Sequence, residues 1–207
     1  MIIAIDGPTA SGKGTLSKRI AAHFDLPHLD TGLLYRAVGR QIILNGGDPD
    51  SPEDALAAVA FPDDLLDEPV LRNEATGSLA SRASVHPAVR KALFDRQRAF
   101  AKQDGGAVLD GRDIGTVIAP DADVKLFITA SVASRAQRRF KEMQERNVSI
   151  SLAEIEADLA RRDARDTGRK DAPLLAANDA YVIDTSELGI EEAFAAALEA
   201  IAAAQKS

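Results

Sequence analysis

The N-terminal stretch constrains the fold of this chain more than any other part of the sequence. An apolar run at residues 2–5 leads into the glycine-rich sequence GPTASGKGT at residues 7–15. Gly7, Gly12 and Lys13 match the pattern G-x-x-x-x-G-K-[ST], in which backbone N–H groups between a strand and a helix surround phosphate oxygens. The residues behind the loop recur at helical spacing, and they are Leu16, Ile20, Ala21 and Phe24. The sequence therefore predicts a strand, a phosphate-binding loop and a helix.

The loop departs from this pattern at one position. Gly14 stands where a serine or threonine contacts Mg²⁺, and Thr15 follows one residue later. A structural turn without a ligand is the alternative, but the spacing, the lysine, the strand and the helix together favour a phosphate site. The predicted ATP-binding residues are Gly7, Pro8, Thr9, Ala10, Ser11, Gly12, Lys13, Gly14 and Thr15.

The rest of the chain alternates between predicted strands and helices. Further strands are predicted at 26–29, 107–110, 124–129 and 181–184. Helices are predicted at 33–44, 51–60, 74–84, 87–103, 131–147, 151–166 and 190–204, and residues 61–71 are expected to be irregular or a small hairpin. This alternation predicts an α/β fold with a parallel sheet covered by helices on both faces. Ligands of such folds bind beyond the carboxyl ends of the strands.

Composition limits the classes of function. The 207 residues suffice for one domain with a sizeable core, and the absence of cysteine excludes disulfides and thiol chemistry. A net charge of −7 argues against broad nucleic-acid binding. The first strand begins at residue 2 and no apolar run approaches membrane-spanning length, so we expect a cytoplasmic protein with no membrane partner. We also expect a monomer.

One segment of this acidic chain is rich in arginine. Residues 135–170 hold ten Lys or Arg and seven Asp or Glu. Arg162, Arg165 and Arg169 fall on one helical face if the helix persists, and Asp166 sits among them. Such a segment suits a small, highly charged anion, with Asp166 accepting from a sugar hydroxyl. A solvated helix face is the alternative.

Two further motifs follow predicted strands. Thr31 and Arg36 can both reach a phosphate at the start of their helix, although a threonine there is often only a cap. Arg112 can clamp a phosphate while Asp113 accepts a hydrogen bond from the exocyclic amine of cytosine and repels the O4 of uracil. The alternative is that Arg112 and Asp113 form an ion pair with each other and bind no ligand.

Six motifs together resemble those of the bacterial cytidylate kinases, a family of nucleoside monophosphate kinases. In chain order they are GPTASGKGT, LDTGLLYRAVG, VRKALFDRQRAF, DGRDIGTV, RRDARDTGRKDAPL and AYVIDTSEL. The family's loop carries Gly-Lys-Gly-Thr, so Gly14 fits it. The resemblance implies a P-loop kinase fold, with phosphoryl transfer from ATP to CMP or dCMP and Mg²⁺ as cofactor. It implies one domain with a core at 1–37 and 105–207, a helical monophosphate-binding insertion at 38–104 and an arginine-rich lid at 145–170.

The resemblance also implies roles for individual residues. Those expected to be catalytic are Lys13, Arg36, Arg112 and Arg162, and Asp110 is expected to contact Mg²⁺ through water, a simple turn acid being the alternative. The expected substrate-binding residues are Thr31, Arg36, Ser81, Arg90, Arg112, Asp113, Arg162, Asp166 and Arg169. Many members of the family carry a three-stranded insertion, for which residues 61–74 look too short and too rich in proline.

The mechanism expected from these residues needs no general base, because the acceptor is an anionic phosphate oxygen. This agrees with the positions of His23, His28 and His86, which lie in no acidic cluster of the sequence. One alternative is another small-molecule kinase acting on AMP, UMP, shikimate or dephospho-coenzyme A. The other is a nucleotide-binding switch that hydrolyses ATP slowly and ignores CMP.

Overall fold

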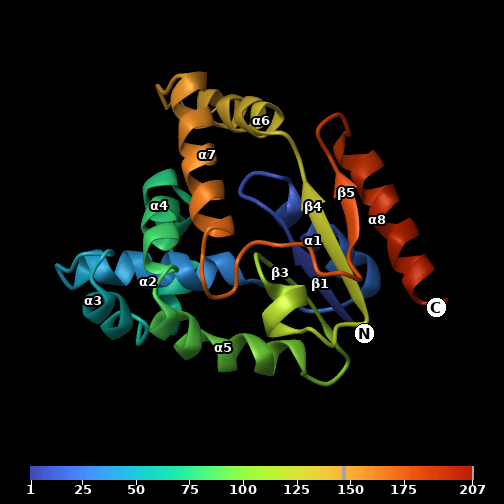
Figure 1. The fold of residues 1–207 in the computed structure, drawn as a ribbon, viewed down its shortest axis with the longest axis horizontal. Helices are drawn as coiled ribbons and strands as arrows, with labels where there is room; N and C mark the ends of the chain where they lie inside the picture. Colours follow the sequence, from blue (N-terminus) through green and yellow to red (C-terminus); the bar gives the residue numbers. More distant parts are fainter. Residues whose placement is uncertain (146–147, 207) are drawn as a thin grey trace. The chain divides into compact units, whose positions relative to one another are not determined.

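The strands of the computed structural model, which describes residues 1–145 and 148–206, form one sheet. The strand order is β2-β3-β1-β4-β5, and Figure 1 labels the last four of these strands. The bounds are β1 (Ile2–Asp6), β2 (His28–Asp30), β3 (Ala107–Gly111), β4 (Val124–Thr129) and β5 (Tyr181–Asp184). β1 runs parallel to β3 and β4, and β4 runs parallel to β5. The predicted α/β fold with a parallel sheet is therefore confirmed.

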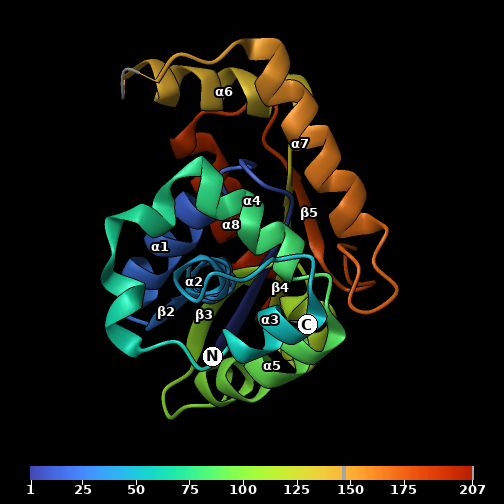
Figure 2. The same cartoon turned by 90° about the vertical axis from the view of Figure 1, so that its left-hand side faces the viewer.

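The chain divides into two compact units. The core unit comprises Met1–His28 and Ala101–Ser207, and the inserted unit comprises Leu29–Phe100. The helices of the core unit are α1 (Lys13–Phe24), α6 (Val132–Glu145), α7 (Leu152–Thr167) and α8 (Ile190–Ala204). Figure 2 shows α6 and α7 packed side by side. The end of the predicted helix 131–147 lies outside the described residues.

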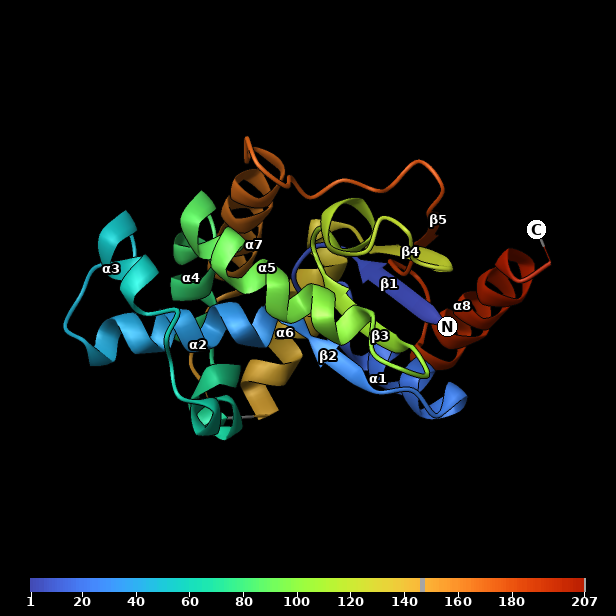
Figure 3. The same cartoon turned by 90° about the horizontal axis from the view of Figure 1, so that it is seen from below.

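The two faces of β1 meet different partners because successive side chains point to opposite sides of a strand. Ile3 and Ile5 are fully buried in a cluster with residues of α1 and α8, which cover that face. Asp6 points to the other face, where its carboxylate meets η3 (Ile114–Ile118), a short π-helix that the sequence did not predict. Figure 3 shows β1 between β3 and β4, with α8 alongside the sheet.

The inserted unit is helical. It contains α2 (Thr31–Leu44), α3 (Pro52–Ala57), α4 (Glu74–Ala83) and nearly all of α5 (Pro87–Ala101). α2 and α4 pack closely, and a Cβ added at Gly39 would lie 2.9 Å from the Cβ of Leu79. Two short 3-10 helices, Asp63–Asp67 and Pro69–Arg72, occupy the segment expected to be irregular or a hairpin. The hairpin alternative is wrong, because both prolines begin or precede a helical turn.

Most predicted helices and strands lie within a few residues of their observed bounds. Ser51 and Ser151 cap α3 and α7, and Glu154 completes the capping box predicted for α7. No helix among the described residues is both long and apolar enough to cross a membrane.

Candidate nucleotide-binding site

The glycine-rich loop is held close to the sheet and ends at the first turn of α1. A Cβ on Gly7 would lie 2.0 Å from the carbonyl oxygen of Ile128 in β4, so only glycine fits there. Gly12 caps α1 with a φ of 88°, a left-handed conformation that glycine adopts without strain. The N-terminal N–H groups of α1 therefore face the loop, where they can bind an anion. Lys13 is buried and its Nζ donates to the carbonyl oxygen of Pro8 at 3.2 Å.

The space beside Gly14 is bordered by an acidic residue. A Cβ placed on Gly14 would lie 3.9 Å from Oδ2 of Asp110, which is an ordinary contact distance. Neither crowding nor a positive φ requires glycine at this position. The consequence of Gly14 is chemical, since the loop offers no hydroxyl at the place where a carboxylate from β3 approaches it.

A cavity of about 490 Å³ adjoins the loop, and this volume falls in the range of small-molecule sites. Its walls come from the loop and the first turn of α1, from β4, from α6, and from the segment that runs from the end of β5 into α8. They comprise Ala10, Ser11, Gly12, Lys13, Gly14, Thr15, Leu16, Ile128, Arg138, Glu142, Thr185, Leu188, Gly189, Ile190 and Ala193. Arg138 donates to the carbonyl and hydroxyl oxygens of Thr185. Thr185 Oγ1 in turn donates to the carbonyl of Ser11 at 3.0 Å, which ties this wall to the loop.

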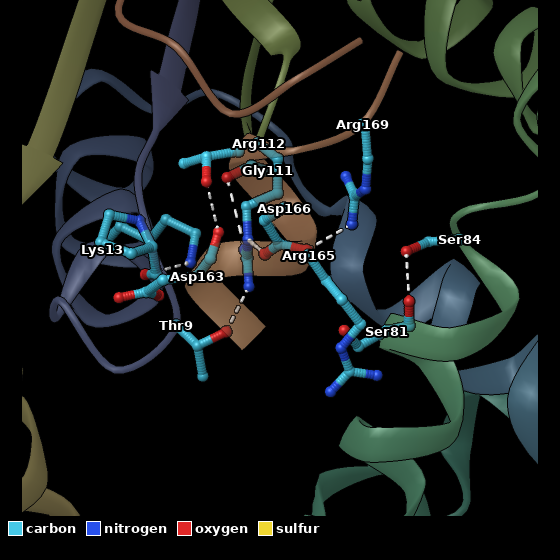
Figure 4. A network of polar contacts seen from close by, with 12 residues as sticks. Thr9, Lys13, Ser81, Ser84, Gly111, Arg112, Asp163, Arg165, Asp166 and Arg169 are labelled. Carbon is cyan, nitrogen blue, oxygen red and sulfur yellow. Dashed lines mark hydrogen bonds and ion pairs between the residues drawn. The ribbon is translucent and has the colours of Figure 1, made fainter. Parts of the chain in front are cut away.

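A network of charged side chains borders the other side of the loop (Figure 4). Nε of Arg112 lies 2.9 Å from Oδ2 of Asp166, and Nη2 of Arg169 lies 2.5 Å from Oδ1. Nη2 of Arg112 also donates to Oγ1 of Thr9 at 2.6 Å. Three of the predicted substrate-binding residues thus come together beside the loop.

The charge of Asp166 is maintained in spite of burial. Its side chain is 4% exposed, and such burial alone would raise the pKa of the carboxyl. The positive charges of Arg112 and Arg169 outweigh burial, so the pKa of Asp166 lies below its ordinary value. The result is a cluster of two arginines with one internal counter-charge.

A second buried arginine joins the loop to α7. Arg135 is 3% exposed, and its guanidinium donates to the carbonyl oxygens of Ala130 and Thr9 and to both carboxylate oxygens of Asp163. Arg162 is equally buried on α7, with its Nε 2.7 Å from Oδ2 of Asp158. The sequence reading missed Arg135 and Asp163. The only feature of the sequence that singled out Arg135 was its position three residues before Arg138 and Arg139.

The segment that carries Arg112 and Asp113 is held by a buried acid. Oδ1 and Oδ2 of Asp6 accept from the N–H groups of Ile114 and Gly115, each at 2.8 Å. Burial raises the pKa of Asp6 to about 7 in spite of these hydrogen bonds. Asp113 is itself 4% exposed. Sequence reasoning missed Asp6, although an acid at the end of a buried strand directly before Gly7 is a recognisable signal.

Asp110 has a histidine partner. Nε2 of His28 lies 2.7 Å from Oδ1 of Asp110, and the two side chains are 15% and 5% exposed. The sequence placed His28 in no acidic cluster and did not predict this contact with a single acid. The adjacency of β2 and β3 brings together residues that are 82 positions apart.

No cluster of three or more His, Cys, Asp or Glu side chains suited to a metal occurs among the described residues. Mg²⁺ commonly retains several waters and binds through one or two carboxylates together with substrate phosphates. Asp110, beside the first turn of α1, fits an ion of this kind. It does not provide a metal site made by the protein alone.

The remaining predicted residues belong to the inserted unit. Thr31 begins α2 and is buried. Nη1 of Arg36 donates to the carbonyl oxygens of Leu71 and Asn73, each at 2.8 Å. The Arg90 guanidinium lies 5.7 Å from the centre of the Tyr35 ring.

Ser81 lies on α4. Its hydroxyl is buried and makes no hydrogen bond to any described residue. Its carbonyl accepts from the hydroxyl of Ser84 at 3.1 Å (Figure 4).

A parallel sheet flanked by helices, with a glycine-rich loop and lysine between β1 and α1, defines a P-loop nucleotide-binding protein. The family model described as cytidylate kinase matches residues 3–203. The chain therefore belongs to the cytidylate kinase family.

Curated relatives agree with this assignment over nearly the whole chain. The chain is 57% identical to a protein named cytidylate kinase from Azorhizobium caulinodans, with 96% of each chain covered. It is 53% identical to one of the same name from Caulobacter sp. strain K31, covering 95% of this chain and 91% of the relative. A third, from Methylocella silvestris, is 52% identical over 100% of this chain and 96% of its own.

A solved structure shares the fold. The crystal structure of an uncharacterized protein from Eubacterium ventriosum has a TM-score of 0.56, with 98% of both chains covered. Its sequence identity is 15%, so the likeness concerns the fold alone.

Proposed function

We propose that this protein transfers the γ-phosphoryl group of ATP to CMP or dCMP, giving ADP and CDP or dCDP. This reaction belongs to pyrimidine nucleotide metabolism. The observation that carries the proposal is the contact at Thr9, where Nη2 of Arg112 lies 2.6 Å from a hydroxyl of the phosphate loop. The phosphate loop and the guanidinium of Arg112, both suited to anions, are therefore neighbours within the core unit. Membership of the cytidylate kinase family supports the choice of nucleotides.

ATP occupies the loop and its adjoining cavity in this proposal. The loop residues 7–15 surround the phosphates, and Lys13 places its positive charge against the β and γ groups. The cavity beside them is lined by Arg138, Thr185 and the first turn of α8, which leaves room for the nucleoside. The apolar side chains of Leu188 and Ile190 give this part of the wall the character of a site for a flat base.

The acceptor is held by the arginines. Arg36 and Arg112 bind its phosphate, and Arg162 and Asp166 contact its pentose. Ser81, Arg90, Asp113 and Arg169 read the base, and Thr31 contributes at the start of α2. A carboxylate at position 113 favours cytosine because it accepts from the exocyclic amine, whereas O4 of uracil offers it no hydrogen.

Catalysis in this proposal consists of positioning and charge neutralisation. The attacking phosphate oxygen is already anionic near neutral pH, so no side chain has to remove a proton. Lys13, Arg112 and Arg162 neutralise the negative charge that two polyanions bring together. α6 and α7 cover the nucleotide and exclude water, which would otherwise accept the phosphoryl group.

Mg²⁺ is the cofactor that this reaction implies. Asp110 would hold it through a water molecule, and the ATP phosphates would supply the other ligands. The bound ion neutralises charge at the β and γ phosphates. Gly14 offers no hydroxyl at this position, and Oδ2 of Asp110 lies 3.9 Å from the place of a Cβ on Gly14.

An acceptor panel tests the proposal. ADP release, measured by a coupled assay, is expected to be fast with CMP and dCMP and slow with UMP, AMP, shikimate and dephospho-coenzyme A. Asp113→Ala should lower the preference for CMP over UMP by about 5- to 150-fold, the equivalent of 1–3 kcal/mol for one base contact. The exposed Asp104 provides the control variant, Asp104→Ala, which should keep the preference. If Asp113→Ala kept the preference for CMP over UMP, Asp113 would not read the base, and the proposed kinase activity would be unaffected.

The panel also separates the other candidates. If another acceptor were phosphorylated as fast as CMP, the protein would be another small-molecule kinase. If the protein hydrolysed ATP slowly and CMP did not change the rate, it would be a regulatory switch. We further propose a cytoplasmic monomer without nucleic-acid or membrane partners. Light scattering after size exclusion measures the oligomeric state.

A further inference from the structure

We propose that His28 is a positioning residue, which fixes the carboxylate of Asp110 for a water-mediated contact with the Mg²⁺ of bound nucleotide. This inference rests on the proposed function, because it concerns the ion that accompanies ATP. His28 touches neither nucleotide nor metal in this proposal and acts only through Asp110.

The geometry assigns separate tasks to the two oxygens of Asp110. Oδ1 lies 2.7 Å from Nε2 of His28, and the tautomer of His28 that carries its hydrogen on Nε2 donates to this oxygen. Oδ2 is the oxygen that faces the phosphate loop, 3.9 Å from the place of a Cβ on Gly14. The histidine bond therefore holds the carboxylate in an orientation that directs Oδ2 toward the first turn of α1.

Burial makes this bond specific. The side chain of Asp110 is 5% exposed and that of His28 is 15% exposed, so little water competes for Oδ1. The two residues come from β2 and β3, adjacent strands of the sheet. A donor fixed on a strand restrains a carboxylate more firmly than a loop residue or a water molecule would.

The composition of the loop increases the importance of this orientation. Where the usual pattern provides a hydroxyl for the metal, this chain has Gly14. The described residues contain no cluster of metal-binding side chains to compensate. Hydrogen-bond partners of metal-binding groups commonly change metal affinity about 10- to 100-fold. A contact through water is expected to lie at the lower end of that range.

Three substitutions separate positioning from simple packing. His28→Phe keeps the ring but removes the donor, and His28→Asn places its amide N–H near the position of Nδ1 rather than Nε2. His28→Gln can return an N–H to the position of Nε2. His23→Phe is the matched control, since His23 is exposed on α1 and contacts the Phe24 and Phe194 rings.

The experiment is calorimetric titration of the full-length protein with ATP, once in EDTA and once in excess MgCl₂. In His28→Phe and His28→Asn we expect unchanged binding in EDTA and a loss of about tenfold in the ratio of the two affinities. His28→Gln should recover most of that ratio, and His23→Phe should resemble the wild type. The concentration of Mg²⁺ that half-saturates turnover should rise in parallel with the lost ratio.

A double-mutant cycle with Asp110→Ala completes the test, because a residue that acts through Asp110 has no further effect once that carboxylate is removed. An unchanged ratio in His28→Phe and His28→Asn would overturn the inference. Equal losses with and without Mg²⁺ would overturn it as well, since they would indicate a structural role. If the wild type transfers phosphate to CMP and these variants show an unchanged ratio or equal losses, only the proposed role of His28 is wrong. If the wild type binds no ATP, the proposed function fails with it.

Discussion

Replacement of Asp166 by asparagine should destabilise the fold by an amount that the charge network allows us to work out. The carboxylate pairs with Arg112 and Arg169, whose side chains are 22% and 6% exposed. Removing one partner of a buried ion pair costs about 3–5 kcal/mol. Because Arg112 can turn toward water, we expect the lower end, about 3 kcal/mol. For a chain of this size that corresponds to a melting temperature lower by roughly 6–12 °C.

The pH dependence of this loss has a definite sign. The pKa of Asp166 is lowered in the folded protein, so its contribution to stability is present above the unfolded value and is lost as pH falls through the folded one. Urea unfolding of wild type and Asp166→Asn should give a constant difference from pH 7 to 5, and the difference should shrink below about pH 4. The exposed Asp171 gives the control, Asp171→Asn, which should change stability little. Equal stability at pH 7, or a difference that widens on acidification, would refute the reasoning.

Three other expectations follow from residues of the same structure. Lys13→Ala should lower turnover by about 100- to 1000-fold, because a preorganised charge at the phosphates is lost; ADP release at saturating ATP measures this, and a near-normal rate would contradict the role of Lys13. The carboxyl of Asp6 should titrate near pH 7 in ¹³C NMR, since burial raises its pKa from 3.8 to about 7. Its contribution to stability is thus complete below pH 3.8 and is lost as pH rises through 7; a midpoint near 4 would exclude the burial argument. Gly39→Ala adds a methyl 2.9 Å from the Cβ of Leu79, and overpacking of about 1–3 kcal/mol should exceed the roughly 1 kcal/mol gained in helix propensity; higher stability in urea would show that α2 and α4 separate at no cost.

Local chemical patterns predicted much of this fold. The loop is readable because Gly7, Gly12 and Lys13 have fixed spacing, and the buried strands are readable as short apolar runs that end in polar residues. Capping by Ser51 and Ser151 was readable as well, since a helix start requires its acceptor within a few residues. The roles assigned to individual site residues in nucleotide binding remain predictions.

Features that depend on packing were not predictable in the same way. Arg135 stands in a run of arginines, and nothing local separates this buried residue from its neighbours. His28 and Asp110 meet only because β2 lies beside β3. The π-helix η3 forms where Asp6, far away in the sequence, accepts from two consecutive N–H groups. The contacts of Arg135 depend on the packing of α6 against α7, and the other two features depend on the order of the strands. A single sequence encodes neither of these locally.

The pairing of Arg112 with Asp166 has a consequence for how tightly an anion can be held. In the proposed function, a phosphate that reaches the Arg112 guanidinium would displace the carboxylate of Asp166, so its binding would release only the difference between the two pairings. This exchange would lower the affinity for a doubly charged phosphate and would ease the release of a product that carries more charge. Asp166 would thereby compete with the phosphate for Arg112 at every turnover.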